Sequence, residues 1–356
     1  DVEVNVGGVK KRYTGKFIFV AVGARPVPPG HIVLDNKVVL DSESILSLKQ
    51  TPRSLIVLGA GVIGCEYASM FSIAGTKVML VDKRDQMLAA VDREIVAHLV
   101  RMFTDYQTDI ILGAEALEVK VRLPKGKVPG QATVKLSNGQ TLVAEAVLVA
   151  MGRTGNTETI GLRDAGVKVN ERGLIEIDKH FRTNVPSIYA VGDVVGPPAL
   201  ASTSMEQGRI ACCHAFGIGD PNMMGEQSMP TLYPYGIYTI PEISMIGATE
   251  EELRKSGAEF VVGRAKYNEL ARGQIVGDRW GLLKLLVDKK TLKLLGVHII
   301  GDNAAEVIHI GQAVMDFGGD ARYFIRSVFN YPTLAEAYKT AAFHAVNQIL
   351  GVTRTV

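Results

Sequence analysis

Leu55-Ile-Val-Leu-Gly59-Ala-Gly61-Val-Ile-Gly64-Cys-Glu66 is the stretch of sequence that decides the fold. Apolar residues run directly into a G-x-G-x-x-G pattern, which predicts a strand, a tight turn and a helix. In such a turn the first glycine bends the chain, the second lets the backbone approach a pyrophosphate, and the third allows close helix–strand packing. The helix N-terminus adds unpaired N–H donors for the phosphates. We therefore predict a dinucleotide site whose turn consists of Gly59, Ala60, Gly61, Val62, Ile63 and Gly64.

The next apolar run, Lys77-Val-Met-Leu-Val81, predicts a second strand, and Asp82 follows directly at its end. An acid at this place can hold the ribose 2′-OH of NAD. Lys83 and Arg84 come next, and either cation can close over the 2′-phosphate of NADP, which Asp82 alone would repel. The sequence thus favours binding of both NAD and NADP, with a solvated basic pair as the alternative for Lys83 and Arg84.

The composition is that of a globular protein with two or three domains. The chain has 356 residues, of which 47% are hydrophobic and 21% are charged. A formal net charge of +2 gives no reason to expect nucleic acid or an anionic membrane as a partner. No uncharged apolar run reaches the roughly 18 residues that a membrane span needs.

Cysteines and histidines indicate neither a disulfide framework nor a metal site. Cys65, Cys212 and Cys213 form no spaced pattern, which fits a reducing compartment and indicates a cytoplasmic location. We expect all three to be small buried side chains. The histidines show no metal-ligand spacing, so no metal is assigned, and His298 is expected in a core.

A strand, a turn and an apolar strand that ends in glycine occur twice, first over residues 2–23 and again over residues 134–152. The second copy closes the domain that the glycine motif begins. By symmetry the first copy should close another dinucleotide-binding domain, whose own strand-turn-helix takes roughly 30 residues that do not precede it. The sequence therefore predicts an N-terminally truncated chain.

A second acid-bearing strand end follows in the middle of the chain. The apolar run Ile188-Tyr-Ala-Val191 ends in Gly192-Asp193, and after a Gly-Pro-Pro turn Ala199-Leu-Ala201 leads into a helix. The carboxylate can bind a hydroxyl-rich chain and the helix dipole a negative ring edge. A mere turn-capping role for Asp193 is the equal alternative.

From about residue 229 onward, antiparallel strands, one of them expected over residues 236–242, and two helices indicate an α+β layer.

Taken together, these motifs resemble the flavoprotein disulfide reductase family, the group of lipoamide dehydrogenase and glutathione reductase. The resemblance covers essentially the whole chain and rests on Ala21-Val-Gly23-Ala-Arg25-Pro26, the glycine motif with Glu66, Gly152-Arg153, Gly192-Asp193 with Leu200-Ala201, Thr239-Ile-Pro241-Glu242 and Leu295-Gly296. It implies an α/β fold with a Rossmann-like NAD(P) domain inserted in an FAD domain, here incomplete, plus a C-terminal α+β interface domain. The implied segments are residues 1–45 (end of the first FAD-domain segment), 46–151 (NAD(P) domain), 152–227 (second FAD-domain segment) and 228–356 (interface domain). The implied FAD contacts are Gly152, Arg153, Gly192, Asp193, Leu200 and Ala201.

One departure from the family pattern decides the chemistry. Disulfide reductases carry a His-Pro-Thr followed by a Glu near the C-terminus, and that His is the acid-base partner of a thiol. This chain reads Asn330-Tyr331-Pro-Thr-Leu-Ala-Glu336, and a phenol with an ordinary pKa of about 10 is no base near neutral pH. Together with Gly155-Asn-Thr157, Gly208-Arg-Ile-Ala211 and Ala271-Arg272, this form resembles the soluble, FAD-dependent pyridine nucleotide transhydrogenase branch of the family.

The resemblance implies hydride transfer between NADPH and NAD⁺ through FAD, in a homodimer. Glu66 would contact the nicotinamide amide, and the loop from Tyr331 to Glu336 would lie against the partner's flavin, so these three residues are the catalytic candidates. An exposed helix acid is the alternative for Glu66. Two other functions stay open: a lipoamide-dehydrogenase-like disulfide reductase with its cysteines in the missing segment, and a catalytically silent nucleotide-binding fragment. Tyr331 argues against the former, and a lack of flavin absorbance would indicate the latter.

Overall fold

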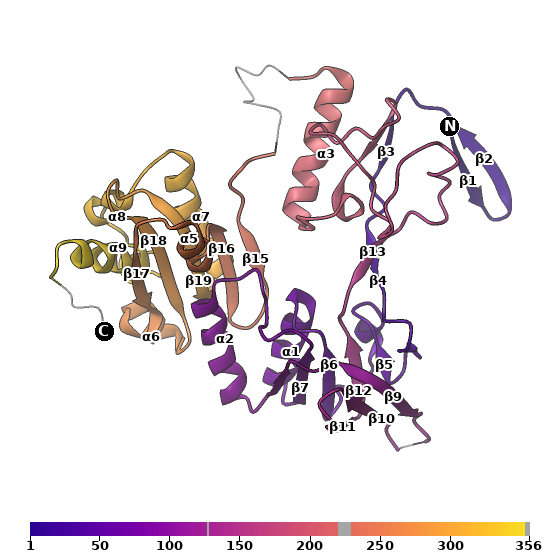
Figure 1. Cartoon of the computed structure of the whole chain (residues 1–356), viewed down its shortest axis with the longest axis horizontal. Coiled ribbons are helices and arrows are strands. Elements are labelled where there is room, and N and C mark those ends of the chain that lie inside the picture. The colour runs from indigo at the N-terminus through magenta and orange to yellow at the C-terminus, as the bar shows by residue number, and fades with distance from the viewer. Residues whose placement is uncertain (127, 220–228, 353–356) are drawn as a thin grey trace. The chain divides into compact units, whose positions relative to one another are not determined.

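The computed structural model describes residues 1–126, 128–219 and 229–352. The chain folds into two compact units, each assembled from two stretches that are distant in sequence (Figure 1). The first unit consists of Asp1–Val27 with Gly152–Thr231, and the second of Pro28–Met151 with Leu232–Val356.

The glycine motif lies in a five-stranded parallel sheet of the second unit, in the order β5-β12-β6-β7-β8. Helices α1 and α2 cover one face of this sheet and the antiparallel strands β9 to β11 cover the other, so its strands are continuous apolar runs. The strand, turn and helix predicted for residues 55–66 are thereby confirmed. The elements are β5 (Val39–Leu40), η1 (Ser44–Ser47), β6 (Ser54–Leu58), α1 (Val62–Ile73), β7 (Lys77–Asp82), α2 (Arg93–Asp105), β8 (Asp109–Leu112), β9 (Ala116–Arg122), β10 (Gln131–Leu136), β11 (Thr141–Ala144) and β12 (Ala146–Val149).

An antiparallel sheet in the order β15-β16-β19-β18-β17 completes the second unit. Apolar side chains of β18 and β19 pack against α7 and α9, which gives the predicted α+β layer a core of its own. Ile237, Ile243, Leu282 and Ile300 of this layer also pack into the core that α1 and α2 share. The elements are β15 (Tyr235–Ile237), β16 (Glu242–Gly247), α5 (Glu250–Ser256), β17 (Phe260–Lys266), η3 (Tyr267–Glu269), α6 (Ala271–Val276), β18 (Leu282–Asp288), β19 (Leu294–Gly301), α7 (Ala304–Asp316), α8 (Ala321–Arg326) and α9 (Glu336–Ile349).

The first unit joins the two other predicted segments through short strands. Strand β3 pairs in parallel with β14, and β4 pairs antiparallel with β13. An aromatic cluster beside the β3–β14 pair connects both strands to α3. The elements are β1 (Val2–Val6), β2 (Val9–Tyr13), β3 (Ile18–Val20), β4 (Ala24–Pro26), β13 (Arg153–Gly155), β14 (Ile188–Ala190), η2 (Gly192–Val195) and α3 (Ala201–Phe216).

Two sequence-based expectations about the chain are wrong. The strand expected over residues 236–242 is in fact a connection, because β15 ends at Ile237 and β16 begins at Glu242. Its backbone is used elsewhere: Tyr238 N–H donates to Glu66, Ile240 N–H donates to Ser69, and the following proline has no N–H for a ladder. Of the three cysteines expected to be buried, only Cys65 is buried, whereas Cys213 is partly exposed and Cys212 is exposed.

The four predicted segments remain a prediction, and their boundary between residues 227 and 228 lies outside the described residues. His298 is fully buried on β19, as expected for a core histidine. Among the described helices, none has the length and apolar character that a membrane crossing requires.

Candidate functional site

The turn between β6 and α1 is shaped by two glycines that no larger residue can replace. Gly59 has a φ of 107°, and a Cβ atom there would lie 2.5 Å from the carbonyl oxygen of Ala150. A Cβ atom at Gly64 would lie 1.7 Å from the carbonyl oxygen of Gly59, so the first turn of α1 rests directly on the strand end. At Gly61 a Cβ atom would meet only the Arg84 guanidinium, 3.9 Å away. The middle glycine therefore faces open space that one cation borders.

Helix α1 begins without a side-chain cap. Gly61 occupies its N-cap position, and no side chain accepts a hydrogen bond from the first helical N–H groups. Helix α2, by contrast, is capped by Asp92, and α5 carries a full capping box of Thr249 and Glu252. The free N–H groups and the dipole of the 12-residue α1 together suit an anion such as a pyrophosphate.

Asp82 at the end of β7 is buried and already holds a guanidinium. Its carboxylate accepts hydrogen bonds from Ala60 N–H at 2.6 Å and from Arg84 N–H, Nε and Nη2 at 2.8, 2.9 and 2.6 Å. Burial opposes ionisation of Asp82, but the bonds from Arg84 and Ala60 outweigh it, so the pKa of the carboxyl lies below its ordinary value. The Arg84 side chain is 44% exposed, and Lys83 is exposed as well. The predicted ribose and phosphate residues thus meet at one point beside the glycine turn.

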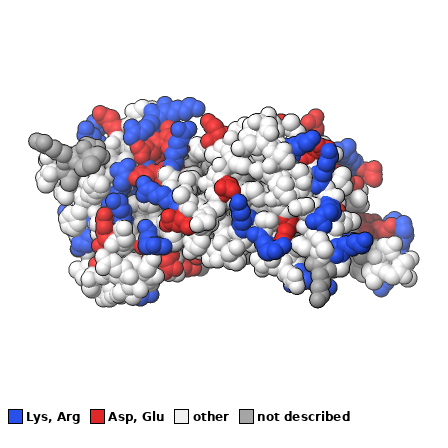
Figure 2. Space-filling view, turned by 90° about the horizontal axis from the view of Figure 1, so that it is seen from below, with Lys and Arg blue, Asp and Glu red and all other residues white. Residues whose placement is uncertain are grey.

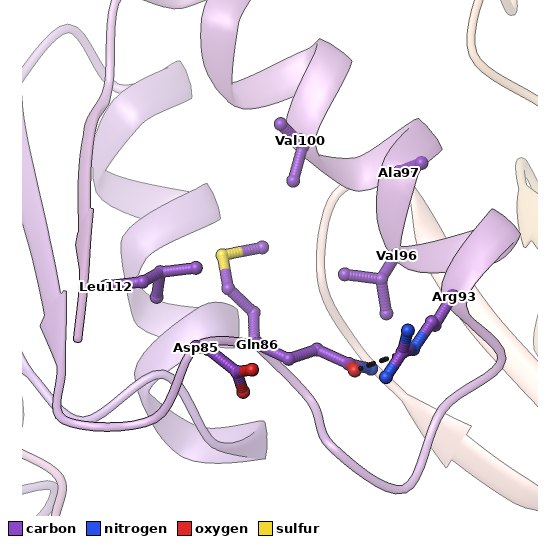
Figure 3. A pocket seen from close by; sticks show the side chains of 8 residues that line it. Asp85, Gln86, Arg93, Val96, Ala97, Val100 and Leu112 are labelled. Atoms are coloured by element: carbon purple, nitrogen blue, oxygen red, sulfur yellow. Dashed lines mark hydrogen bonds between the residues drawn. The ribbon is translucent and has the colours of Figure 1, made fainter.

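A pocket of about 320 Å³ is lined by Asp85, the residue that follows Arg84 in the chain (Figure 3). Because Asp82 and Leu112 are partners in the β7–β8 register, the pocket opens at the carboxyl edge of the sheet, where open α/β sheets bind ligands. Gln86 accepts a hydrogen bond from Arg93 Nε at 3.1 Å across its mouth. Sequence reasoning missed this pocket, since α2 reads as an ordinary surface helix. Its lining is Asp85, Gln86, Met87, Arg93, Val96, Ala97, Val100 and Leu112.

Glu66 on α1 is half-buried, so it is not the exposed helix acid of the alternative interpretation. Its Oε1 accepts a hydrogen bond from Tyr238 N–H at 2.8 Å. Burial raises the pKa of Glu66 above its ordinary value, while the bond from Tyr238 acts in the opposite direction. One carboxylate oxygen is engaged in this bond.

The second predicted site lies wholly in the first unit. Gly192 has a φ of 82° and donates its N–H to Gln207 on α3 at 2.7 Å, which fixes the turn between β14 and the helix. The carboxylate of Asp193 lies 3.8 Å from Arg153 Nη2, and both side chains are about one-third exposed. Leu200 is the N-cap residue of the 16-residue α3, and its side chain accepts no hydrogen bond. The backbone N–H groups in the first turn of α3, from Ala201 onward, therefore have no side-chain cap. A carboxylate beside an uncapped helix start fits the ribitol chain and the ring edge of a flavin.

Tyr331 and Glu336 occupy the segment that joins α8 to α9. Tyr331 is 73% exposed, whereas Glu336 is half-buried in the first turn of α9. Within residues 1–126, 128–219 and 229–352, no three His, Cys, Asp or Glu side chains are grouped so that they could hold a metal ion.

Comparison with known proteins gives consistent relatives for the whole chain. Residues 1–208 match the family described as pyridine nucleotide-disulphide oxidoreductase, and residues 233–342 match the dimerisation domain of the same family. A protein named soluble pyridine nucleotide transhydrogenase from Mycobacterium tuberculosis is 50% identical over 340 residues, covering 96% of this chain and 70% of that protein. One of the same name from Pseudomonas savastanoi is 43% identical, covering 98% of this chain and 74% of its own length.

Among solved structures, the Cu(II) complex of the HOCl-induced flavoprotein disulfide reductase RclA from Escherichia coli superimposes with a TM-score of 0.88 at 30% identity. The match covers 96% of this chain and 75% of that one. The fold predicted from the motifs is therefore confirmed.

Proposed function

The chain belongs to the pyridine nucleotide-disulphide oxidoreductase family, and from this premise we propose that it transfers a hydride between NADPH and NAD⁺. The observation that carries the proposal is Tyr331, an exposed phenol at the place of the histidine that serves a thiol in disulfide reductases. Hydride transfer between two nicotinamides needs no such base. The relatives named transhydrogenases support this assignment over a disulfide reductase.

The dinucleotide substrates would bind along the carboxyl edge of the parallel sheet. The glycine turn and the uncapped start of α1 hold the pyrophosphate. Asp82 takes the ribose diol of NAD(H), whereas Arg84 and Lys83 take the 2′-phosphate of NADP(H). The adjacent pocket of about 320 Å³, lined in part by Met87, Val96 and Leu112, would receive the adenine ring. Glu66 contacts the carboxamide of the nicotinamide through the carboxylate oxygen that Tyr238 leaves free.

The resident cofactor is FAD, which supplies a group that accepts a hydride from one nicotinamide and donates it to another. In this chain the Asp193 carboxylate would accept hydrogen bonds from the ribitol hydroxyl groups, and the N-terminus of α3 would face the electron-rich edge of the flavin ring. Arg153 beside Asp193 keeps the carboxylate oriented. The residues that would hold the cofactor are Gly152, Arg153, Gly192, Asp193, Leu200 and Ala201.

We also propose a cytoplasmic homodimer. The dimerisation-domain match covers residues 233–342, which include Tyr331 and Glu336, so these two residues would act at the partner's flavin rather than at their own. Figure 2 shows Lys and Arg side chains mixed with Asp and Glu side chains over one face, without a large patch of a single sign. Together with the formal net charge of +2, this face gives no reason to expect nucleic acid or an anionic membrane as a partner.

The test is a direct assay of the purified protein. We expect NADPH to reduce the thionicotinamide analogue of NAD⁺, absorbance in the flavin band, and no turnover of dihydrolipoamide. Substantial dihydrolipoamide oxidation would instead establish the disulfide reductase, the activity named for the RclA relative. A colourless protein without hydride transfer would establish the silent nucleotide-binding fragment.

A further inference from the structure

A lysine in the middle of an apolar strand is the most deeply buried Lys or Arg among the described residues. Lys284 on β18 is 1% exposed, and its Nζ lies 2.9 Å from both oxygens of Asp92. The same Nζ lies 2.5 Å from Glu250 Oε2 and 3.0 Å from Glu94 Oε2. Asp92 and Glu94 belong to the start of α2, which packs on the parallel sheet β5-β12-β6-β7-β8 (the nucleotide layer). The cluster therefore joins this layer to the antiparallel sheet β15-β16-β19-β18-β17 with its helices (the C-terminal layer).

Two arginines complete the cluster. Arg264 on β17 binds Glu94 with both Nε and Nη2, at 2.6 and 2.9 Å. Arg254 pairs with Glu250 on α5. Three carboxylates therefore meet three cations, and the two cations that reach α2 both come from the C-terminal sheet. Since a buried charge that loses its partner is strongly unfavourable, the start of α2 is held firmly in place.

The far end of α2 is attached to the same layer. His98 Nδ1 lies 2.7 Å from the carbonyl oxygen of Trp280, just before β18. The indole N–H of Trp280 donates to Asp105, the last residue of α2, at 2.9 Å. The C-terminal layer thus contacts α2 at its start, its middle and its end.

Another side of α2 forms a wall of the pocket beside Asp82. Arg93, Val96, Ala97 and Val100 face the loop that carries Asp85 and Gln86 (Figure 3). Arg93 is the immediate neighbour of both Asp92 and Glu94, so the ion cluster and the pocket wall share the first turn of α2.

We propose that Lys284 is a positioning residue for nucleotide binding. Its ion pairs set the place of α2, and through α2 the width of the pocket that receives the adenosine end. The proposal rests on the proposed function for the identity of the nucleotide and for the place of its adenine ring. It assigns to the C-terminal layer a role in the affinity for substrate, in addition to any role at a subunit interface.

The test replaces the lysine by an uncharged chain of similar length, Lys284→Met. We expect the Kd for NADPH, measured by titration calorimetry, and the Michaelis constants for both nucleotides to rise about tenfold. The value of kcat should stay within about twofold, because uniform binding is lost and no transition-state contact is removed. The emission of Trp280, the only tryptophan of the chain, should shift to longer wavelength as the α2 contact loosens.

The matched control is Lys290→Met. Lys290 lies on the exposed turn that follows β18, and its side chain is 80% exposed. It pairs with Glu259, which precedes β17. Its loss should leave Kd and emission at parental values. If Lys284→Met fails to fold, Arg264→Gln removes the outer cation and should raise Kd about threefold.

Adding Glu250→Gln to Lys284→Met restores the balance between carboxylates and cations in the cluster and should recover part of the lost affinity. A folded Lys284→Met or Arg264→Gln protein with parental Kd overturns the positioning role. Absence of hydride transfer in the parent would refute the proposed function alone, since Kd is measured without turnover.

Discussion

Arg84→Ala is the substitution that most sharply tests how one site serves both NAD(H) and NADP(H). Arg84 lies between the buried carboxylate of Asp82 and the open side of Gly61, where the phosphates would pass. A charge-assisted contact to a 2′-phosphate is worth about 1.5–3 kcal/mol, which corresponds to a ten- to hundredfold change in affinity. The half-exposed position of Arg84 reduces this value, but its removal also leaves Asp82 unneutralised in front of the phosphate. We therefore expect the Michaelis constant for NADPH to rise by at least about tenfold.

NADH should respond differently, because its ribose carries no phosphate. Arg84→Ala removes the guanidinium from Asp82 and leaves the carboxylate only the backbone N–H bonds of residues 60 and 84. The diol then has no competing side chain, so the Michaelis constant for NADH should stay constant or fall. Asp82→Asn should act in reverse: the amide oxygen can still accept the Ala60 N–H, while the released Arg84 turns to the phosphate. This variant should weaken NADH and spare or improve NADPH.

Steady-state kinetics with each nucleotide, at low and at physiological salt, measure these effects. The loss of NADPH affinity should shrink with added salt, because a partly exposed ion pair is screened over about 8 Å at physiological ionic strength. Lys83→Ala should show the same selectivity with a smaller amplitude, since Lys83 is exposed and has no fixed place beside Asp82. If both basic substitutions leave the NADPH/NADH preference within about twofold of the parent, the phosphate is held elsewhere and the reasoning is refuted.

Gly64→Ala should abolish nucleotide binding and lower the melting temperature, because its Cβ would lie 1.7 Å from the carbonyl oxygen of Gly59; calorimetric binding at parental affinity would contradict the tight turn. Acid should unfold the protein through the Lys284 cluster: burial opposes ionisation of Asp92, Glu94 and Glu250, yet their cationic neighbours keep each pKa below its ordinary value of 3.8 or 4.5. The stabilisation that these carboxylates provide is thus present above those values and lost as the pH falls below them. Denaturant titrations between about pH 5 and pH 3 should therefore show that the free energy of unfolding falls less steeply with pH in Lys284→Met than in the parent. Tyr331→His should create no dihydrolipoamide turnover, and new turnover would show that a suitable thiol pair is present. Sedimentation at micromolar concentration should give a dimer, and a monomer would remove the role assigned to Tyr331 and Glu336 at a partner's flavin.

Local patterns in the sequence predicted the nucleotide turn well, because its physics is local. The apolar strand, the spacing of Gly59 and Gly64, and the acid at the end of the second strand each depend on near neighbours. The same reasoning could not show that Arg84 folds back onto Asp82, since the direction of a side chain in a loop depends on the carboxylate that it meets in space.

Contacts between distant segments lay beyond sequence reasoning. Asp92 and Lys284 are 192 positions apart, and no spacing rule connects them. One signal was available: Lys284 interrupts the apolar run of residues 281–287, and a lysine in a buried strand requires a partner. The strand expected over residues 236–242 was wrong for a related reason, because two of its N–H groups are taken by Glu66 and Ser69 on α1.

The shared core of the second unit has a consequence for how the chain is made. Helix α2 leaves the ribosome long before Lys284, the lysine that pairs with its first residues, because 192 positions separate Asp92 from Lys284. At about 5–20 residues per second this interval lasts roughly 10–40 s, during which the parallel sheet and its helices lack the apolar side chain of Ile300. The nascent sheet therefore exposes apolar surface, and a version of the gene that ends before residue 282 should yield aggregation-prone protein.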